Sequence, residues 1–186
     1  MTKELKQSLL VTGIVVLAVA IDQALKLYIR THFVLGESHA ITSWFWITFV
    51  ENEGMAFGIK WFSKLLLTLF RIAAVGVLGW YMHRLIHINR ARVSYLSVIA
   101  LVTAGAIGNI IDCVCYGKLF GYAGWFYGRV VDMLYFPLIT NAAGECIFFR
   151  PVFNFADACI TTSVIVIILF FRKDLDASLQ KCDKSE

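Results

Sequence analysis

The sequence predicts an all-α membrane protein, a four-helix transmembrane bundle that carries a small extracytoplasmic β-rich platform and loop. Hydrophobic residues make up 59% of the 186 residues and charged residues 16%, and the mean hydropathy is +0.73. Soluble domains are about 45–50% apolar and about 25% charged. The composition therefore indicates a lipid environment. The net charge of +4 comes without a dense basic face, so nucleic acid is not expected as a partner.

Four apolar segments are long enough to cross a bilayer, which takes about 20 helical residues. The first could instead be a cleaved signal peptide, because it follows Lys3 and Lys6 and contains Ala18-Val19-Ala20, which resembles a cleavage site. Its apolar face continues beyond that point, which favours an uncleaved helix. We expect one integral membrane domain over residues 1–186, with spans at about 8–28, 61–82, 94–111 and 155–171.

Lysine and arginine are denser on one side of the predicted bundle, which by the positive-inside rule is the cytoplasmic side. That side holds both termini and the short 83–93 loop. The connections 31–60 and 112–154 then lie outside. An even number of spans requires both termini on one side, in agreement with the charges.

The outer connections have the composition of a surface platform. Residues 41–50 are rich in β-branched and aromatic residues, which favours strands. Four tryptophans fit the aromatic belt at a membrane interface: Trp44, Trp46, Trp61 and Trp125. A loop that merely follows the interface and a platform that receives a substrate from the outer leaflet both fit this pattern.

Ionisable residues inside the spans are costly unless they are paired or hydrated. Asp22 and Lys26 are four residues apart in the first span, so they share a helix face and can form an ion pair that orients the helix. Arg71 in the second span needs an acid, a lipid phosphate or water, and Asp22 and Asp112 are the plausible acids. Asn109 and Asp112 end the third span three residues apart, so both can face one pocket.

Two further aspartates lie at the same predicted outer depth. Asp132 follows an apolar, strand-like run, and Asp157 follows Asn154, a good helix N-cap, at the start of the fourth span. Each has a simple structural explanation, as a turn residue or as an anion near a helix N-terminus. Together with Asn109 and Asp112, they would share a pocket if the third and fourth spans are neighbours.

Asp132 and Asp157 would form a catalytic pair in such a poorly solvated pocket. Two carboxyl groups held close together do not both ionise easily, so one keeps a proton. The ionised group can activate water as a general base, and the protonated group can protonate the leaving amine. This chemistry needs no metal or cofactor, and none is expected.

Four blocks of the sequence, in order between residues 22 and 157, resemble the lipoprotein signal peptidases (signal peptidase II). The first block, Asp22-Gln23-Ala24-Leu25-Lys26, is similar to D-Q-x-x-K, and the second, Asn52-Glu53-Gly54-Met55-Ala56-Phe57, is similar to N-x-G-x-A-F. The third has two parts: Gly108-Asn109-Ile110-Ile111-Asp112 is similar to G-N-x-x-D, and Gly128-Arg129-Val130-Val131-Asp132 is similar to G-x-V-x-D. The fourth, Phe153-Asn154-Phe155-Ala156-Asp157, is similar to F-N-x-A-D.

The resemblance implies an aspartic endopeptidase of the bacterial cytoplasmic (inner) membrane with Asp132 and Asp157 as its catalytic residues. It implies cleavage before the lipid-modified cysteine of a prolipoprotein, at the outer face, beside membrane lipids, and inhibition by the antibiotic globomycin. Residues expected to bind substrate or support the site are Asp22, Lys26, Asn52, Gly54, Arg71, Asn109, Asp112, Arg129, Asn154 and Ala156.

The chain departs from the family pattern at two places. An arginine commonly follows the aspartate of G-N-x-x-D, but Cys113 stands here, and the stretch before G-x-V-x-D is longer by most of residues 118–127. Arg129 or Arg71 could supply the missing cation.

Two other function classes fit parts of the sequence. A small transporter could use Asp22, Lys26 and Arg71 as a polar pathway, but no repeated half is present and the polar groups cluster at one face. A scaffold protein could bind partners through the outer loops, and only the ordered motifs speak against it.

Overall fold

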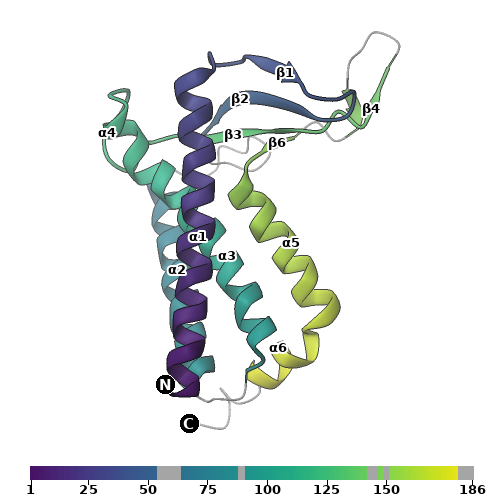
Figure 1. The fold of residues 1–186 in the computed structure, drawn as a ribbon. Helices are drawn as coiled ribbons and strands as arrows, with labels where there is room; N and C mark the ends of the chain where they lie inside the picture. Colours follow the sequence, from purple (N-terminus) through teal and green to yellow (C-terminus); the bar gives the residue numbers. More distant parts are fainter. Residues whose placement is uncertain (54–63, 88–90, 142–145, 149–150, 180–186) are drawn as a thin grey trace. The chain divides into compact units, whose positions relative to one another are not determined.

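The computed structural model is mainly helical and contains a small antiparallel sheet (Figure 1). It describes residues 1–53, 64–87, 91–141, 146–148 and 151–179. The chain divides into two compact units. The first comprises Met1–Ala20, Phe70–Ile107 and Ala156–Glu186, and the second comprises Ile21–Leu69 and Gly108–Phe155.

Among the described residues, three helices are long and apolar enough to cross a membrane: α1 (Lys3–His32), α2 (Lys64–His87) and α3 (Val93–Ile111), which continues helically to Leu119. A fourth span exists only if α5 (Phe155–Phe170) and α6 (Arg172–Leu179), which meet at a bend of 85°, count as one. The prediction of a mainly helical membrane protein with a small sheet is confirmed. The described residues contain three or four helices that could cross a membrane.

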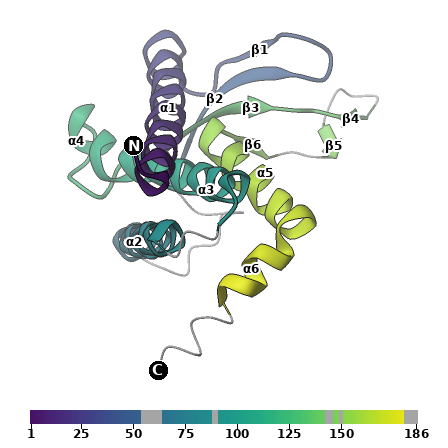
Figure 2. The same cartoon turned by 60° about the horizontal axis from the view of Figure 1, so that its bottom comes forward.

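The core of the first unit consists of apolar side chains from α2, α3 and the N-terminal half of α1. Figure 2 shows the ribbons of these helices from their lower ends. Leu96 and Ala100 of α3 are almost fully buried against Met82 and Leu85 of α2. Most of the remaining large apolar side chains on α1 and α2 are exposed, as expected for helices whose outer faces contact lipid.

Within this unit α3 and α5 come into backbone contact at Gly105. A Cβ atom added there would lie 2.4 Å from the carbonyl oxygen of Ala156 and 2.7 Å from Ile160 Cγ1. Small residues let membrane helices approach this closely. The contact also explains the burial of Ala156, a predicted site residue, which is 1% exposed.

The second unit contains a four-stranded antiparallel sheet with the order β1-β2-β3-β6 (Figure 1). Its strands are β1 (Ser38–Ala40), β2 (Trp46–Asn52), β3 (Val130–Tyr135) and β6 (Val152–Phe153); a separate pair consists of β4 (Ile139–Thr140) and β5 (Cys146–Phe148). The predicted β-rich platform is present, but the strand expected from residue 41 begins only at Trp46. Thr42 Oγ1 accepts the amides of Trp44 and Phe45, which favours a turn there.

Alternation along β3 sends its side chains to opposite faces of the sheet. Val131 and Met133 join Phe49 of β2, together with Ile29 of α1 and Tyr116, in an apolar cluster. Asp132 lies between Val131 and Met133 in sequence, so it points to the other face. This strand thus holds the predicted catalytic aspartate while its neighbours bury apolar surface.

The third predicted span ends at residue 111, but the helical path continues through a π-helical turn at Asp112–Tyr116 and α4 (Gly117–Leu119). The longer loop then folds back onto this turn, since Gly128 N donates to Cys113 O at 2.8 Å and Phe126 N to Val114 O at 3.1 Å. A Cβ on Gly128 would lie 2.0 Å from Asp112 O, so only glycine fits. The hydrogen bonds of this returning loop sustain helix beyond the apolar stretch.

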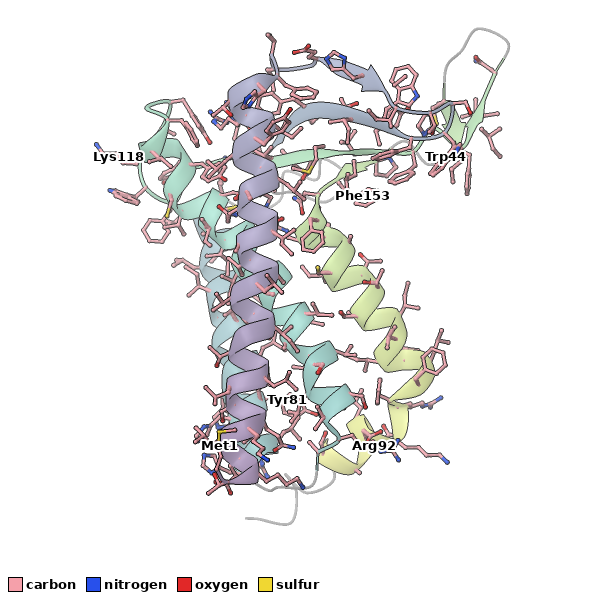
Figure 3. All side chains as sticks on the ribbon, viewed as in Figure 1. Met1, Trp44, Tyr81, Arg92, Lys118 and Phe153 are labelled. Atoms are coloured by element: carbon pink, nitrogen blue, oxygen red, sulfur yellow. The ribbon has the colours of Figure 1, made fainter. Side chains whose placement is uncertain are left out.

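Aromatic residues gather where β1 turns into β2, and Figure 3 shows Trp44 there. Phe136 stacks on Phe45 with ring centroids 5.0 Å apart and on Phe153 at 5.6 Å. Trp44 and Trp125 are more than half exposed, in keeping with an interfacial belt. Trp46 packs edge-on against Tyr135, and Trp61 lies outside the described residues.

We expect Gly105→Ala to destabilise the protein by about 1–3 kcal/mol, because overpacking forces the two helices apart. Gly79→Ala in α2 is the matched control, since a Cβ there meets nothing within 4 Å. It should leave stability unchanged or raise it by about 0.5–1 kcal/mol, the helix-propensity difference. Thermal unfolding in detergent measures both, and equal melting temperatures would contradict the close contact.

Candidate functional site

The second unit contains a fully buried lysine whose ammonium group has three polar neighbours. Lys26 Nζ lies 2.9 Å from Asp22 Oδ2, 2.8 Å from Asp112 Oδ2 and 3.0 Å from Asn109 Oδ1. The predicted Asp22–Lys26 pair is therefore confirmed, and Asp112 joins it from the turn after α3. Four predicted site residues therefore meet at this point: Asp22 and Lys26 from one face of α1, and Asn109 and Asp112 from the end of α3 and the turn after it.

Gln23 completes the hydrogen bonding of the two carboxylates. Its Nε2 donates to Asp22 Oδ2 at 3.1 Å and to Asp112 Oδ1 at 2.9 Å, and its Oε1 accepts the Tyr116 hydroxyl at 3.1 Å. The amide of Val131 donates to Asp112 Oδ2 at 3.2 Å. Two carboxylates and one ammonium leave a formal charge of −1, which these neutral donors help to stabilise in a buried site.

Asp132 is 2% exposed and receives a side-chain amide on each carboxyl oxygen. Asn154 Nδ2 donates to Oδ1 at 2.7 Å, and Asn52 Nδ2 donates to Oδ2 at 3.1 Å. The sheet register accounts for Asn52. Val50 is paired with Asp132 across the two strands, and Asn52 is two residues further along β2, on the same face.

Asn154 connects Asp132 to the lysine cluster. It directly precedes α5, and its Nδ2 also donates to Asn109 Oδ1 at 3.1 Å, the oxygen that Lys26 contacts. Of the four residues predicted to share a pocket, Asn109, Asp112 and Asp132 are joined within this unit by hydrogen bonds through Lys26, Asn154 and Val131. The fourth, Asp157, belongs to the first unit.

Besides Ala156, three predicted site residues do not belong to the described part of the second unit. Asp157 is half-buried in the first turn of α5, as predicted, but it belongs to the first unit, so its pairing with Asp132 stays a prediction. Arg71 is a residue of α2 in the same unit, and its role also stays a prediction. Gly54 lies outside the described residues.

Arg129 takes part in a brace between α1, β2 and the returning loop. Its guanidinium donates to Glu51 Oε2 at 2.9 Å, and Arg30 binds the other oxygen of the same carboxylate. Arg30 also lies over the Phe120 ring, 4.1 Å from its centroid. Burial by itself would raise the pKa of Glu51, but the hydrogen bonds from Arg129 and Arg30 outweigh it and lower that pKa.

Sequence reasoning missed several residues of these two clusters. Gln23 was visible inside the first motif, and a glutamine within a span is itself a signal for polar contacts. Arg30 and Glu51 carried no comparable signal, because charged residues are ordinary at a helix end and in a surface strand. Only the pairing of β2 with β3 brings Glu51 and Arg129 to one place.

The site offers a buried carboxylate oriented by two amide donors. Hydrogen bonds to the charged form favour it, so Asp132 can act as a base toward a water molecule. Asn154 is held in place by a second contact, because its Nδ2 also donates to Asn109 Oδ1.

Comparisons with known proteins show which family the chain resembles. Residues 14–172 match the family described as Signal peptidase (SPase) II. The chain is 41% identical to the lipoprotein signal peptidase of Porphyromonas gingivalis strain ATCC 33277, over 94% of this chain and 88% of the relative. It is 30% identical to that of Streptococcus pneumoniae strain R6, over 91% and 97%.

Two solved structures, each titled as a bacterial membrane enzyme structure by the in meso method, are also similar. The one at 2.3 Å resolution has a TM-score of 0.66 at 30% identity and covers 89% of this chain and 88% of its own. The one at 1.9 Å has a TM-score of 0.63 at 30% identity, over 88% and 93%. The motifs, the fold and the extent of the match lead to one conclusion: the chain belongs to the signal peptidase II family.

Proposed function

We propose that this membrane protein is an aspartic endopeptidase that removes signal peptides from lipid-modified prolipoproteins by cleaving before the lipidated cysteine. Peptidase activity follows from the family. The observation that carries the aspartic mechanism is the environment of Asp132, a buried carboxylate with an amide donor on each oxygen. A side chain that served only as a turn residue would not need such a setting.

Asp132 and Asp157 share the chemistry in this proposal. The ionised carboxylate takes a proton from water, and the resulting hydroxide adds to the scissile carbonyl carbon. The protonated carboxyl gives its proton to the amide nitrogen as the C–N bond breaks, so the pair returns to one proton in total. The products are the signal peptide, with a new carboxylate, and a lipoprotein with a free amino group on its lipidated cysteine.

The other predicted residues support this pair in different ways. Asn52 and Asn154 orient Asp132, and Asn109, Asp112, Asp22 and Lys26 hold the buried cluster behind them. We further propose that Gly54 and Arg71 contact or support the substrate. Globomycin would inhibit by occupying the same site, and the acyl chains of the substrate would remain among membrane lipids.

We infer that Arg129 acts as a brace rather than as a substitute for the family arginine missing at Cys113. It shares Glu51 with Arg30, so it ties the returning loop to β2 and α1. Cys113 itself is buried, and its carbonyl oxygen accepts Gly128 N. The loop therefore closes by backbone hydrogen bonds at the position where the family places a cation.

The density of lysine and arginine supports a location in the bacterial cytoplasmic membrane with both termini inside and Asp132 near the outer face. At about 1.5 Å per residue, the 30 residues of α1 span about 45 Å, more than the hydrocarbon core. The polar cluster at Asp22 and Lys26 thus falls toward one end of α1, while Lys3 and Lys6 mark the other.

Asp132→Asn and Asp157→Asn should each lower prolipoprotein cleavage by about 10²–10⁴-fold, because each removes a general acid or base. The measurement is the rate of signal-peptide release from a diacylglyceryl-modified precursor by purified protein in detergent. Asp176→Asn, on the exposed face of α6, is the matched control and should cleave normally. Unchanged cleavage by either catalytic variant, at normal melting temperature, would refute the dyad.

Glu51→Gln should reduce stability near pH 7 by on the order of 1–3 kcal/mol, since two charge-assisted hydrogen bonds are weakened. The pKa of Glu51 is lowered in the folded protein, so its contribution is present above the ordinary value of 4.5 and is lost as the pH falls through the lowered pKa. The difference from wild type should therefore shrink in acid. Exposed Glu53→Gln serves as the control, and a deficit independent of pH would contradict the ionic origin.

An epitope inserted after Glu37 should be accessible to antibody in intact spheroplasts, and one placed after Ser178 should become accessible only after lysis. Both sites are on exposed or half-exposed segments beyond the apolar stretches. The reverse pattern would overturn the proposed orientation without affecting the catalytic assignment.

A further inference from the structure

The contacts of Lys26 fix which way the neighbouring amide points. An ammonium group has three hydrogen-bond donors and no acceptor. Its three contacts are Asp22 Oδ2, Asp112 Oδ2 and Asn109 Oδ1. The first two are carboxylates, so the third partner must also present an acceptor. Asn109 is therefore held with its oxygen toward Lys26.

This orientation passes on to the next amide. The same Asn109 Oδ1 accepts Asn154 Nδ2 at 3.1 Å, so Asn154 must present its NH₂ group. That nitrogen also donates to Asp132 Oδ1 at 2.7 Å. An NH₂ group has two hydrogens, and these two contacts use both. If Asn109 were turned round, Asn154 would have to turn as well, and its oxygen would face the carboxylate.

Asp132 receives a second donor from the opposite side. Asn52 Nδ2 lies 3.1 Å from Oδ2 and comes from β2, independently of the chain that starts at Lys26. Each carboxyl oxygen of Asp132 thus faces an N–H group. A protonated carboxyl would have to use one of these oxygens as a hydroxyl, which is a poorer acceptor, so both contacts favour the carboxylate.

We propose that Lys26, through Asn109 and Asn154, holds Asp132 as the ionised member of the proposed catalytic pair. Lys26, Asn109 and Asn154 are positioning residues in this scheme. The proposal rests on the proposed aspartic function and refines it, since it makes Asp132 the base that takes the proton from water and Asp157 the acid that protonates the leaving nitrogen.

Several described charged groups lie on the elements that carry Asp132 and its partners. Asp22 and Asp112, whose charges would disfavour a further carboxylate, are both paired with Lys26. Glu51 on the neighbouring strand is bound by Arg30 and Arg129. Glu53 is exposed beyond the end of that strand, where solvent screens it. Lys64, at the start of α2, adds a positive charge near Glu51 and Glu53.

Infrared spectroscopy of the full-length protein in detergent tests the assignment. In the Asp157→Asn variant, only Asp132 of the pair can titrate. Its carboxyl band is identified by its loss in the Asp132→Asn/Asp157→Asn double variant. We expect no protonated band from Asp132 at pH 7, and a protonated band at that pH would overturn the proposal.

Asn109→Ala, added to Asp157→Asn, tests the chain of amides. It removes the acceptor that orients Asn154 but leaves Lys26 with both carboxylates, so the buried ion cluster is retained. The midpoint at which Asp132 gains its proton should rise by about one pH unit or more, the equivalent of losing one hydrogen bond to a charged group. An unchanged midpoint would overturn the role of the chain.

Tyr116→Phe is the matched control, because it removes a hydrogen bond to Gln23 in the same cluster without touching the amide chain. It should leave the midpoint in place, and an equal shift there would show that any local disturbance suffices and would count against the proposal. In otherwise wild-type protein, Asn109→Ala should also move the acid limb of kcat/KM for prolipoprotein cleavage upward, and Tyr116→Phe should not.

The infrared experiment and the cleavage experiment test the two proposals separately. A wild-type protein that does not cleave prolipoproteins would refute the proposed function, while Asp132 could still titrate as expected. Conversely, normal cleavage together with a protonated Asp132 at pH 7 would preserve the function and reject only this assignment of the proton.

Discussion

The second unit depends on the contact between the Lys26 ammonium and the carboxylates of Asp22 and Asp112. Burying an isolated charge in a membrane helix costs several kcal/mol, and removing one partner of a buried pair leaves the other charge uncompensated. The cluster is therefore stable only when α1 and the turn after α3 are both in place. Since Asp112 also accepts the amide of Val131, the same charges fix the start of the strand that presents Asp132.

Two further contacts involve backbone atoms and no charged side chains. Gly105 lets α3 meet α5 at Ala156, and Gly128 lets the returning loop close on the carbonyl of Asp112. A methyl group at either position would collide with a backbone oxygen. Such contacts explain why small residues stand beside the polar motifs. A network of amides keeps its donor and acceptor directions only if the backbones that carry it cannot shift by an ångström.

Much of the fold could be predicted from local properties of the sequence. Apolar stretches of the right length indicate helices in lipid, and the spacing of Asp22 and Lys26 predicts their ion pair. The β-rich platform follows from its β-branched and aromatic residues. The helical extension beyond residue 111 could not be predicted in this way, because the hydrogen bonds of a distant loop sustain it. The late start of β2 depends on the Thr42 side chain binding its own turn.

The sequence by itself determined the membrane class and the ordered motifs, and it singled out the two aspartates proposed as the catalytic pair, because these depend on composition and on residues close together in the chain. Only the tertiary structure decided that Lys26 bonds Asn109 and both carboxylates, that Asn52 and Asn154 each bind one oxygen of Asp132, and that Arg129 shares Glu51 with Arg30. The physical reason is that hydrogen bonds and charge pairs act over about 3–4 Å in space. A linear motif states which polar groups are present, and the packing of helices and strands decides which of them meet.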